Sequence, residues 1–342
     1  MIRRRVLPLL ALALLLSEPL LAQLPRPAAG YLGTAGLRTW ARTAAFPRTI
    51  VVDSGGAGDY ASVSAGLTAA AALSPAPAIF DRVLVLVYPG VRTTGNCPYT
   101  EASLTVPAHV SLVGLIPGSA GAGSFTGHTN ICLTGTSGTL VSVGDKAQIA
   151  RLDLELSAAL TADTVAVGKS SGTGTATMND VVISAGSVVG DSFNLDLINN
   201  SSGGLYLEDV GIWRVGTATK TRHIVNSSAT GVSHYRGRLR VGTSQAVVVE
   251  TTGSGIIKLW STRLDANGTC DLKSAAADSI EAYSVEYRTT CGAGTVSNAI
   301  TYIDALSSPS GTCPPGRMGY DASYLYLCNA SGAWRRVAHE TF

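Results

Sequence analysis

Two aspartates and one arginine follow one another at a constant interval in the middle of the chain. Asp180, Asp209 and Arg238 are separated by 29 residues in each step. If each step is one turn of a repeat, the two carboxylates lie about 4.8 Å apart on neighbouring strands, with a guanidinium group beside them. Two carboxylates at this distance repel, so one should hold its proton more tightly than a free carboxyl group does. The alternative, which we favour, is a surface ladder in which Arg151 and Arg238 neutralise the aspartates.

Aromatic side chains that lie beside the same positions could bind a carbohydrate. Exposed rings on a long strand face can stack against sugar rings, whereas the structural alternative is packing beneath loops. We expect no cofactor and no metal, because the chain lacks a Cys-x-x-Cys motif and a phosphate loop, and its five histidines are scattered. The candidate ligand-binding residues are Trp213, Trp260, Tyr206 and Tyr235, and Tyr283 lies in a similar place.

These positions belong to a repeated strand pattern. Stretches such as QIARLDLEL, TMNDVVISA and LYLEDVGIW share the order apolar-x-x-apolar-x-apolar. Alternation of this kind indicates a strand with one buried face, and its return every 23–29 residues indicates a stacked repeat. The three aligned columns are Leu154, Ile183, Ile212, Val241, Leu264 and Tyr287; Leu152, Val181, Val210, Leu239, Thr262 and Val285; and Ile149, Met178, Leu207, Arg236, Leu259 and Ala282, in which Arg236 is the exception.

The length and composition of the repeat predict an all-β fold. Of the 342 residues only 14% are charged and 38 are glycine, which favours strands and turns over a helical bundle. Three short strands and three turns fit one coil, so we predict a parallel β-helix over residues 49–305. A helix at Tyr60–Leu73 would cap its N-terminal end, residues 23–48 would form a linker, and residues 306–342 would form a small hairpin module.

The first 22 residues predict export. MIRRRVLPLLALALLLSEPLLA has the basic start, apolar run and small-residue end of a secretory signal peptide, with a membrane anchor as the alternative. Without it, 25 − 3 = 22 basic and 23 − 1 = 22 acidic residues remain, so the exported chain is formally neutral. We therefore expect no nucleic-acid partner, and no stable membrane span after the signal is cleaved.

All six cysteines lie in the exported part, which favours disulfides over free buried thiols. We predict that neighbours pair, and the predicted pairs are Cys97–Cys132, Cys270–Cys291 and Cys313–Cys328. Asn-x-Ser/Thr sequons matter only in a glycosylating host, and their asparagines include Asn200, Asn226, Asn267 and Asn329.

Three stretches near the N-terminus resemble a known family. VVDSGGAGDYASVSAGLTAA, VLVYPGV and LTVPAHVSLVG resemble, in this order, the opening of pectin-lyase-like right-handed β-helix proteins. The pectinesterase-type opening is most similar, with a strand, a Gly-rich turn, a capping helix and a Pro-Gly-x-Tyr-x-Glu coil. The resemblance covers about Ile50–Gly118 and implies a single-stranded right-handed β-helix. It also implies a catalytic trio, in which one aspartate is the nucleophile, the other is the acid/base and an arginine lies on the same sheet, and Asp180, Asp209 and Arg238 could form it. Two features depart from the family: Arg92 stands where the family has tyrosine, and the family's Gly-x-x-Asp-Phe-Ile-Phe-Gly segment is missing.

The C-terminal stretch TCPPGRMGYDASYLYLCNASGAWRRVAHETF resembles a second kind of module. Similar hairpins end many phage tail-fibre and virion-appendage proteins. The pattern predicts strands at Tyr324–Cys328 and Ala333–Val337, and an ordinary cap over the last coil is the alternative.

Two classes of function follow from this pattern. The first is an exported non-catalytic β-helix protein, secreted, periplasmic or at the cell surface, that presents a rigid face to a polysaccharide or cell-surface glycan, as an adhesin or appendage does. The second is a carbohydrate-active enzyme, either a pectinesterase-like esterase or a polysaccharide lyase, since one fold hosts both. A homo-oligomer is compatible with either class.

Overall fold

The computed structural model describes most of the chain after Pro47. Arg48–Phe342 form one compact unit, and the predictions for residues 1–47, the signal peptide and most of the linker, lie outside the described residues. The described ranges are 48–90, 97–115, 129–185, 193–214, 221–229, 231–240, 247–265, 270–274, 280–283, 285, 290–292, 296–297, 301–303, 317–320, 324–328 and 333–338.

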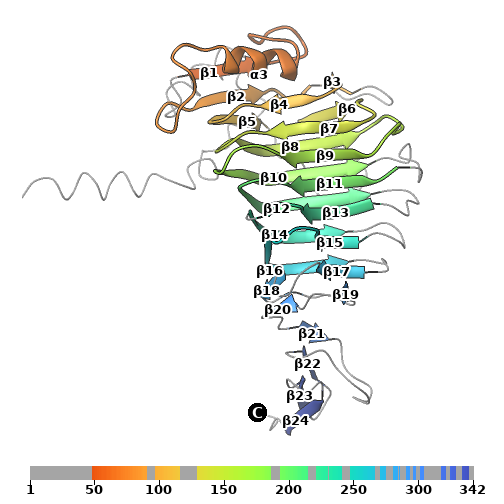
Figure 1. The fold of residues 1–342 in the computed structure, drawn as a ribbon. Helices are drawn as coiled ribbons and strands as arrows, with labels where there is room; N and C mark the ends of the chain where they lie inside the picture. Colours follow the sequence, from red (N-terminus) through yellow and green to blue (C-terminus); the bar gives the residue numbers. More distant parts are fainter. Residues whose placement is uncertain are drawn as a thin grey trace, which may run out of the picture. The chain divides into compact units, whose positions relative to one another are not determined.

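The fold is the all-β parallel β-helix that the repeat predicts. Two long parallel sheets run through it, and strands of successive coils lie side by side in each (Figure 1). The larger sheet follows the order β1 (Arg48–Val52), β2 (Val83–Val87), β5 (Val110–Gly114), β8 (Gln148–Leu156), β10 (Thr175–Ala185), β12 (Gly204–Arg214), β14 (Val232–Arg240), β16 (Ile256–Asp265), β18 (Ile280–Tyr283) and β20 (Val296–Ser297). In addition, β6 (Asn130–Leu133) pairs with β8, and β3 (Tyr99–Glu101) pairs with β6. The second sheet follows the order β4 (Leu104–Val106), β7 (Gly138–Val143), β9 (Thr164–Lys169), β11 (Leu195–Asn200), β13 (Thr221–Asn226), β15 (Val247–Thr251), β17 (Cys270–Ser274) and β19 (Thr290–Gly292).

The apolar-x-x-apolar-x-apolar pattern has a geometric cause. In β10, side chains point alternately into and out of the core until Asp180, where the backbone turns to a left-handed φ of 52° and the strand bends. The bend adds one residue between two inward positions, so Met178 and Val181 are both buried. Arg151 in β8 and Asp209 in β12 have φ values of 56° and 50°, which gives each coil the same bend.

The predicted apolar columns form the core of these coils. Leu154, Ile183 and Ile212 pair along the sheet, as do Leu152, Val181 and Val210. All six side chains are at most 1% exposed. Burial of such side chains contributes about 1.5–3 kcal/mol each, so the stacked columns hold the coils together.

The predicted alignment is wrong at β14, whereas Leu259, Leu264 and Ala282 of the following coils lie in the columns predicted for them. Leu207 pairs with Tyr235 rather than with Arg236, and Ile212 pairs with Leu239 rather than with Val241, because the β12–β14 register shifts within the bend. The step falls from 29 residues to 235 − 207 = 28 and then to 239 − 212 = 27. Arg236 therefore does not interrupt the apolar column, since Tyr235 fills that place in the core and is fully buried.

A short helix covers the N-terminal end of the core. Helix α3 (Val63–Ala71) is shorter than the predicted Tyr60–Leu73, and Tyr60 is exposed. The Ser62 hydroxyl accepts a hydrogen bond from the Ala65 amide at 3.3 Å, which is a normal N-cap. The helix packs close to β1, because a Cβ at Gly66 would lie 2.6 Å from Val52 Cγ2.

The C-terminal strands form a separate small sheet. β22 (Arg317–Tyr320), β23 (Tyr324–Cys328) and β24 (Trp334–Ala338) are antiparallel, which confirms the predicted hairpin, and β21 (Thr301–Ile303) pairs parallel with β22. No helix in the described ranges is both long enough and apolar enough to span a membrane.

Candidate functional site

The two candidate catalytic aspartates occupy equivalent bends of neighbouring coils. Asn179 pairs with Glu208 and Val181 pairs with Val210, so Asp180 and Asp209 follow one another along the sheet. Asp180 is half-buried and Asp209 is exposed. A left-handed φ favours glycine, and aspartate and asparagine are the side chains that tolerate it best. The bend itself thus accounts for aspartate at both positions.

Arg238 does not continue this arrangement in the expected register. Between the pairs Glu208–Arg236 and Ile212–Leu239, β12 has three residues whereas β14 has two. On the other side of β14, Arg238 pairs with Arg263 of β16. The constant interval of 29 residues therefore does not describe the strand positions at Arg238, whose side chain lies outside the described residues.

A row of aromatic rings lies on the outer face of four consecutive strands. Tyr206, His234, Trp260 and Tyr283, which we call the aromatic row, come from β12, β14, β16 and β18. The centroids of His234 and Trp260 are 5.0 Å apart with nearly parallel planes, and those of Trp260 and Tyr283 are 5.7 Å apart. Tyr206 lies 6.0 Å from His234 with the rings tilted by 39°.

The central rings of the aromatic row stack face to face on one another. Trp260 has His234 on one face and Tyr283 on the other, so a sugar cannot stack on either face of the indole. A ligand would instead meet ring edges and the polar atoms of the rings. The sequence predicted Tyr206, Trp260 and Tyr283 but missed His234, although the outward position of His234 follows from its pairing with Tyr206.

Charged side chains border the aromatic row. Lys258 Nζ lies 3.0 Å from Glu281, and the Tyr283 hydroxyl donates a 2.9 Å hydrogen bond to the same carboxylate. On the other side, Glu208 accepts a hydrogen bond from the Asn179 amide at 3.2 Å and lies 3.9 Å from the exposed guanidinium of Arg236.

The imidazole of His234 is biased toward its neutral form. Burial lowers its pKa first, the nearby Lys258 ammonium lowers it further, and Glu281 opposes the shift. At neutral pH the ring therefore offers one hydrogen-bond donor and one acceptor.

Two of the predicted ligand-binding residues, Tyr235 and Trp213, are not part of the aromatic row. The prediction for Tyr235 is wrong, because its side chain is fully buried and its hydroxyl donates a 2.8 Å hydrogen bond to the Val210 carbonyl. Burial also raises the pKa of this hydroxyl. Trp213 lies on β12 and pairs with Ser184 and Arg240, and its side chain lies outside the described residues.

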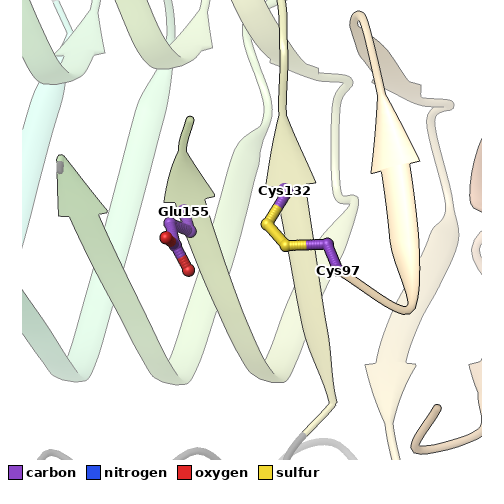
Figure 2. Close-up of side chains that lie close together, drawn as sticks. All are labelled: Cys97, Cys132 and Glu155. Carbon is purple, nitrogen blue, oxygen red and sulfur yellow. A yellow bond between two sulfur atoms is a disulfide. The ribbon is translucent and has the colours of Figure 1, made fainter. Parts of the chain in front are cut away.

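One of the three predicted disulfides is present. Cys97, just before β3, is bonded to Cys132 of β6, and their Cα atoms are 6.0 Å apart (Figure 2). The Glu155 carboxylate on β8 lies beside this bond, with ligand atoms of the three residues within 4.8 Å of one another. Because both sulfurs are bonded to each other, they offer no thiolate for a metal, and the group is a covalent link between coils.

The strand register argues against the second predicted pair. Cys291 pairs with Lys273, which is three residues beyond Cys270 on β17. Three residues of strand span about 10 Å, which exceeds the Cα separation of about 7 Å that a disulfide can bridge. The register gives no support to a Cys270–Cys291 bond, and because the side chains of both cysteines lie outside the described residues, this pair stays a prediction. Cys313 and the side chain of Cys328 lie outside the described residues.

The second sheet carries a chain of alternating charges. Arg222 donates two hydrogen bonds of 2.6 and 2.9 Å to Asp196 and one of 3.2 Å to Glu250, and Lys273 lies 2.7 Å from Glu250. Although burial opposes the charge of Arg222, these two carboxylates raise its pKa. Each of these four charged side chains has a neighbour of opposite charge. The row of charges therefore holds the coils together rather than binding an ionic ligand.

A buried polar column follows the edge of the same sheet. Asn200 pairs with Lys169 and with Asn226, and both asparagines are fully buried. The Asn226 amide donates 3.0 Å hydrogen bonds to the carbonyls of Gly231 and Ile256, which belong to two successive coils. These sequon asparagines are therefore structural.

Comparison with other proteins identifies no relative: no protein family matches the chain, and neither the curated proteins nor the solved structures compared with it contain a match.

Proposed function

We propose that this chain is an exported, non-catalytic β-helix protein that binds a polysaccharide or cell-surface glycan along the outer face of β12–β18. The observation that carries the proposal is the aromatic row, which repeats one ring per coil over four coils. A linear polymer with a repeating unit is the natural partner of a surface that repeats at about 4.8 Å.

The chemistry of the row suits hydroxyl-rich ligands. Trp260 carries an indole N–H donor, His234 carries a donor and an acceptor, and Arg236 extends a largely exposed guanidinium beside them. Because the rings are stacked on one another and on a rigid sheet, they lose little conformational entropy when a glycan binds.

Two features support a relationship to the families that the sequence resembles. Strand β1, a Gly-rich turn, helix α3 and strand β2 occur in the order of the pectinesterase-type opening. Tyr99 and Glu101 also supply a Tyr-x-Glu pair, 99 − 92 = 7 residues later than the resemblance places it. Glu101 accepts hydrogen bonds from the Val63 and Ser64 amides at the start of α3, so the pair has a structural role here. The C-terminal hairpin supports an appendage-like protein in the same way.

The enzymatic alternative has less support. The left-handed backbone at the two bends already explains why aspartate stands at both positions. The two aspartates are therefore no evidence for a catalytic pair. We therefore expect no release of methanol, acetate or unsaturated sugars from acidic polysaccharides above the uncatalysed background.

The test is a glycan-binding screen with the exported protein, followed by affinity measurements on the best ligand. His234→Ala and Trp260→Ala should each weaken binding about tenfold or more, because ring edges and hydrogen bonds at the centre of an interface each contribute over 1 kcal/mol. Tyr60→Ala is the matched control, since Tyr60 is an exposed ring outside the row, and it should bind as the wild type does. Equal binding by all three variants would refute the proposed face.

A further inference from the structure

A tight turn at the N-terminal end of the β-helix exposes two large apolar side chains. Phe80 is 98% exposed and Ile79 is 47% exposed, and Phe80 is the most exposed large apolar residue in the described ranges. Both lie at the tip of a turn closed by two hydrogen bonds of 3.1 Å between the backbone groups of Ala78 and Asp81. The backbone therefore holds these two side chains out into solvent.

The turn is fixed to the body of the protein from both sides. The Arg48 guanidinium donates hydrogen bonds to the Asp81 carboxylate and to the Pro75 carbonyl oxygen. Directly after the turn, Arg82 donates a 2.7 Å hydrogen bond to the Lys146 carbonyl oxygen. A turn held in this way pays little entropy when its tip is buried by a partner.

Positive charge lies beside the apolar tip. The turns of successive coils meet here, because the His109 amide donates a 3.0 Å hydrogen bond to the Asp145 carbonyl. Burial lowers the pKa of the His109 imidazole most, and the positive charges of Arg82 and Lys146 lower it further. Two pairs cancel, Arg48 with Asp81 and Lys169 with Asp145. Among the described residues, the charged side chains on these turns and at the adjoining strand ends are Arg48, Arg82, Lys146 and Lys169 against Asp81 and Asp145, which is a formal charge of 4 − 2 = +2.

We propose that the Ile79–Phe80 turn is a membrane anchor, which inserts its apolar tip into a lipid surface that carries anionic headgroups. Arg82 and Lys146 would contact the headgroups. Apolar side chains that enter the headgroup boundary, together with basic residues beside them, are the two components of peripheral membrane binding.

The shape of the turn favours lipid over a protein partner. A stable protein interface buries about 800 Å² of each partner over a well-packed surface. Two side chains at the tip of a two-residue turn form a narrow projection rather than such a surface. Fluid lipid can close around a projection, whereas a protein would need a matching pocket.

The first experiment measures sedimentation of the exported protein with vesicles of phosphatidylglycerol and phosphatidylcholine in equal parts. Phe80→Ser should reduce the bound fraction about tenfold or more, because the burial of a phenyl group in lipid is lost. Leu327→Ser is the matched control, since Leu327 on β23 is 46% exposed, close to the value for Ile79. This control should bind as the wild type does, and unchanged thermal unfolding of both variants would show that the fold is intact.

A second comparison tests the role of charge. Binding of the wild type should fall with rising salt and should be weak on vesicles of phosphatidylcholine alone. Lys146→Gln should lower binding to the anionic vesicles several-fold and flatten its salt dependence.

Three results would overturn the proposal. In the first, the wild type binds no vesicles. In the second, the Phe80→Ser variant binds vesicles as well as the wild type does. In the third, the wild type is a dimer that dissociates when Phe80 is replaced. The last result would assign the turn to self-association instead. None of these outcomes depends on glycan binding, which the aromatic row mediates in the proposed function.

Discussion

The residues at the bends of the long strands show how one backbone requirement can resemble an active site. Arg151, Asp180 and Asp209 all have left-handed φ angles, and the side chains at these positions repeat because the bend repeats. A left-handed φ costs a non-glycine residue about 1–2 kcal/mol, and aspartate and asparagine less. Where a charged residue recurs in a repeat protein, its backbone conformation should therefore be considered as the cause before catalysis is.

Substitutions at Asp209 separate the two explanations. Asp209→Gly should keep or raise the free energy of unfolding, whereas Asp209→Val should lower it by about 1–2 kcal/mol, because a β-branched side chain fits this φ poorly. Thr177→Val, at a half-exposed extended position of β10, should change stability by about 0.5 kcal/mol or less. Urea denaturation measures all three. If Asp209→Gly instead abolished a polysaccharide-degrading activity of the wild type, the enzymatic alternative would replace our proposal.

Among the elements, the turns between strands are joined by an ion pair in which the lysine is buried and the aspartate is partly exposed. Lys169, the last residue of β9, has a fully buried side chain whose Nζ donates 2.7 Å hydrogen bonds to Asp145 and to the Ser171 carbonyl. The hydrogen bond from Lys169 is the largest cause that lowers the Asp145 pKa below its ordinary value of 3.8, and the Gly174 amide adds to it. The pair joins the turn before β8 to the turn after β9.

This ion pair predicts a specific dependence of stability on pH. Because the Asp145 pKa is lower in the folded than in the unfolded chain, its contribution is present above about pH 4 and is lost as the pH falls below that value. Asp145→Asn should lower the free energy of unfolding by about 2–3 kcal/mol at pH 7, since it leaves the Lys169 ammonium buried without its counter-charge. The difference between wild type and variant should shrink between about pH 5 and pH 2. A difference that stayed constant over this range would contradict the assignment.

The strands also show what the sequence could and could not predict. Burial alternates along each strand, so the apolar columns and the parallel β-helix could be predicted from the spacing of residues such as Val181 and Ile183. The register of β14 could not, because Tyr235 fits either as an exposed ring or as core, and only the packing between coils decides. Three rings of the aromatic row could be predicted because tyrosine and tryptophan are obvious candidates, whereas the outward position of His234 depends on the corrected register.

For the whole molecule, the parallel β-helix implies that stability is distributed coil by coil. Each coil pairs only with the coils before and after it, and repeat proteins of this kind behave as a sum of unit and neighbour terms. The Cys97–Cys132 bond and helix α3 both stabilise the first coils. The helix also covers the N-terminal end of the core, which would otherwise be exposed.

A charge in the core should therefore unfold the molecule from the middle. Ile183→Asp should lower the free energy of unfolding by about 3 kcal/mol or more, because it buries a carboxylate without a partner. Thr177→Asp is the control on the same strand, at a half-exposed position, and should cost about 1 kcal/mol or less. Hydrogen exchange should rise first in β8, β10 and β12 of the Ile183→Asp variant. Uniform exchange along the chain would show instead that the coils unfold as one unit.

The buried polar column has a practical consequence for producing this protein. Asn200 and Asn226 stand in sequons and are fully buried, with the Asn226 amide bonded to two successive coils. In yeast or mammalian secretory pathways, an oligosaccharide is attached to such asparagines while the chain is still unfolded. A sugar at either position would keep the coils from closing, so glycosylating hosts should yield misfolded protein, and a bacterial host is the appropriate source.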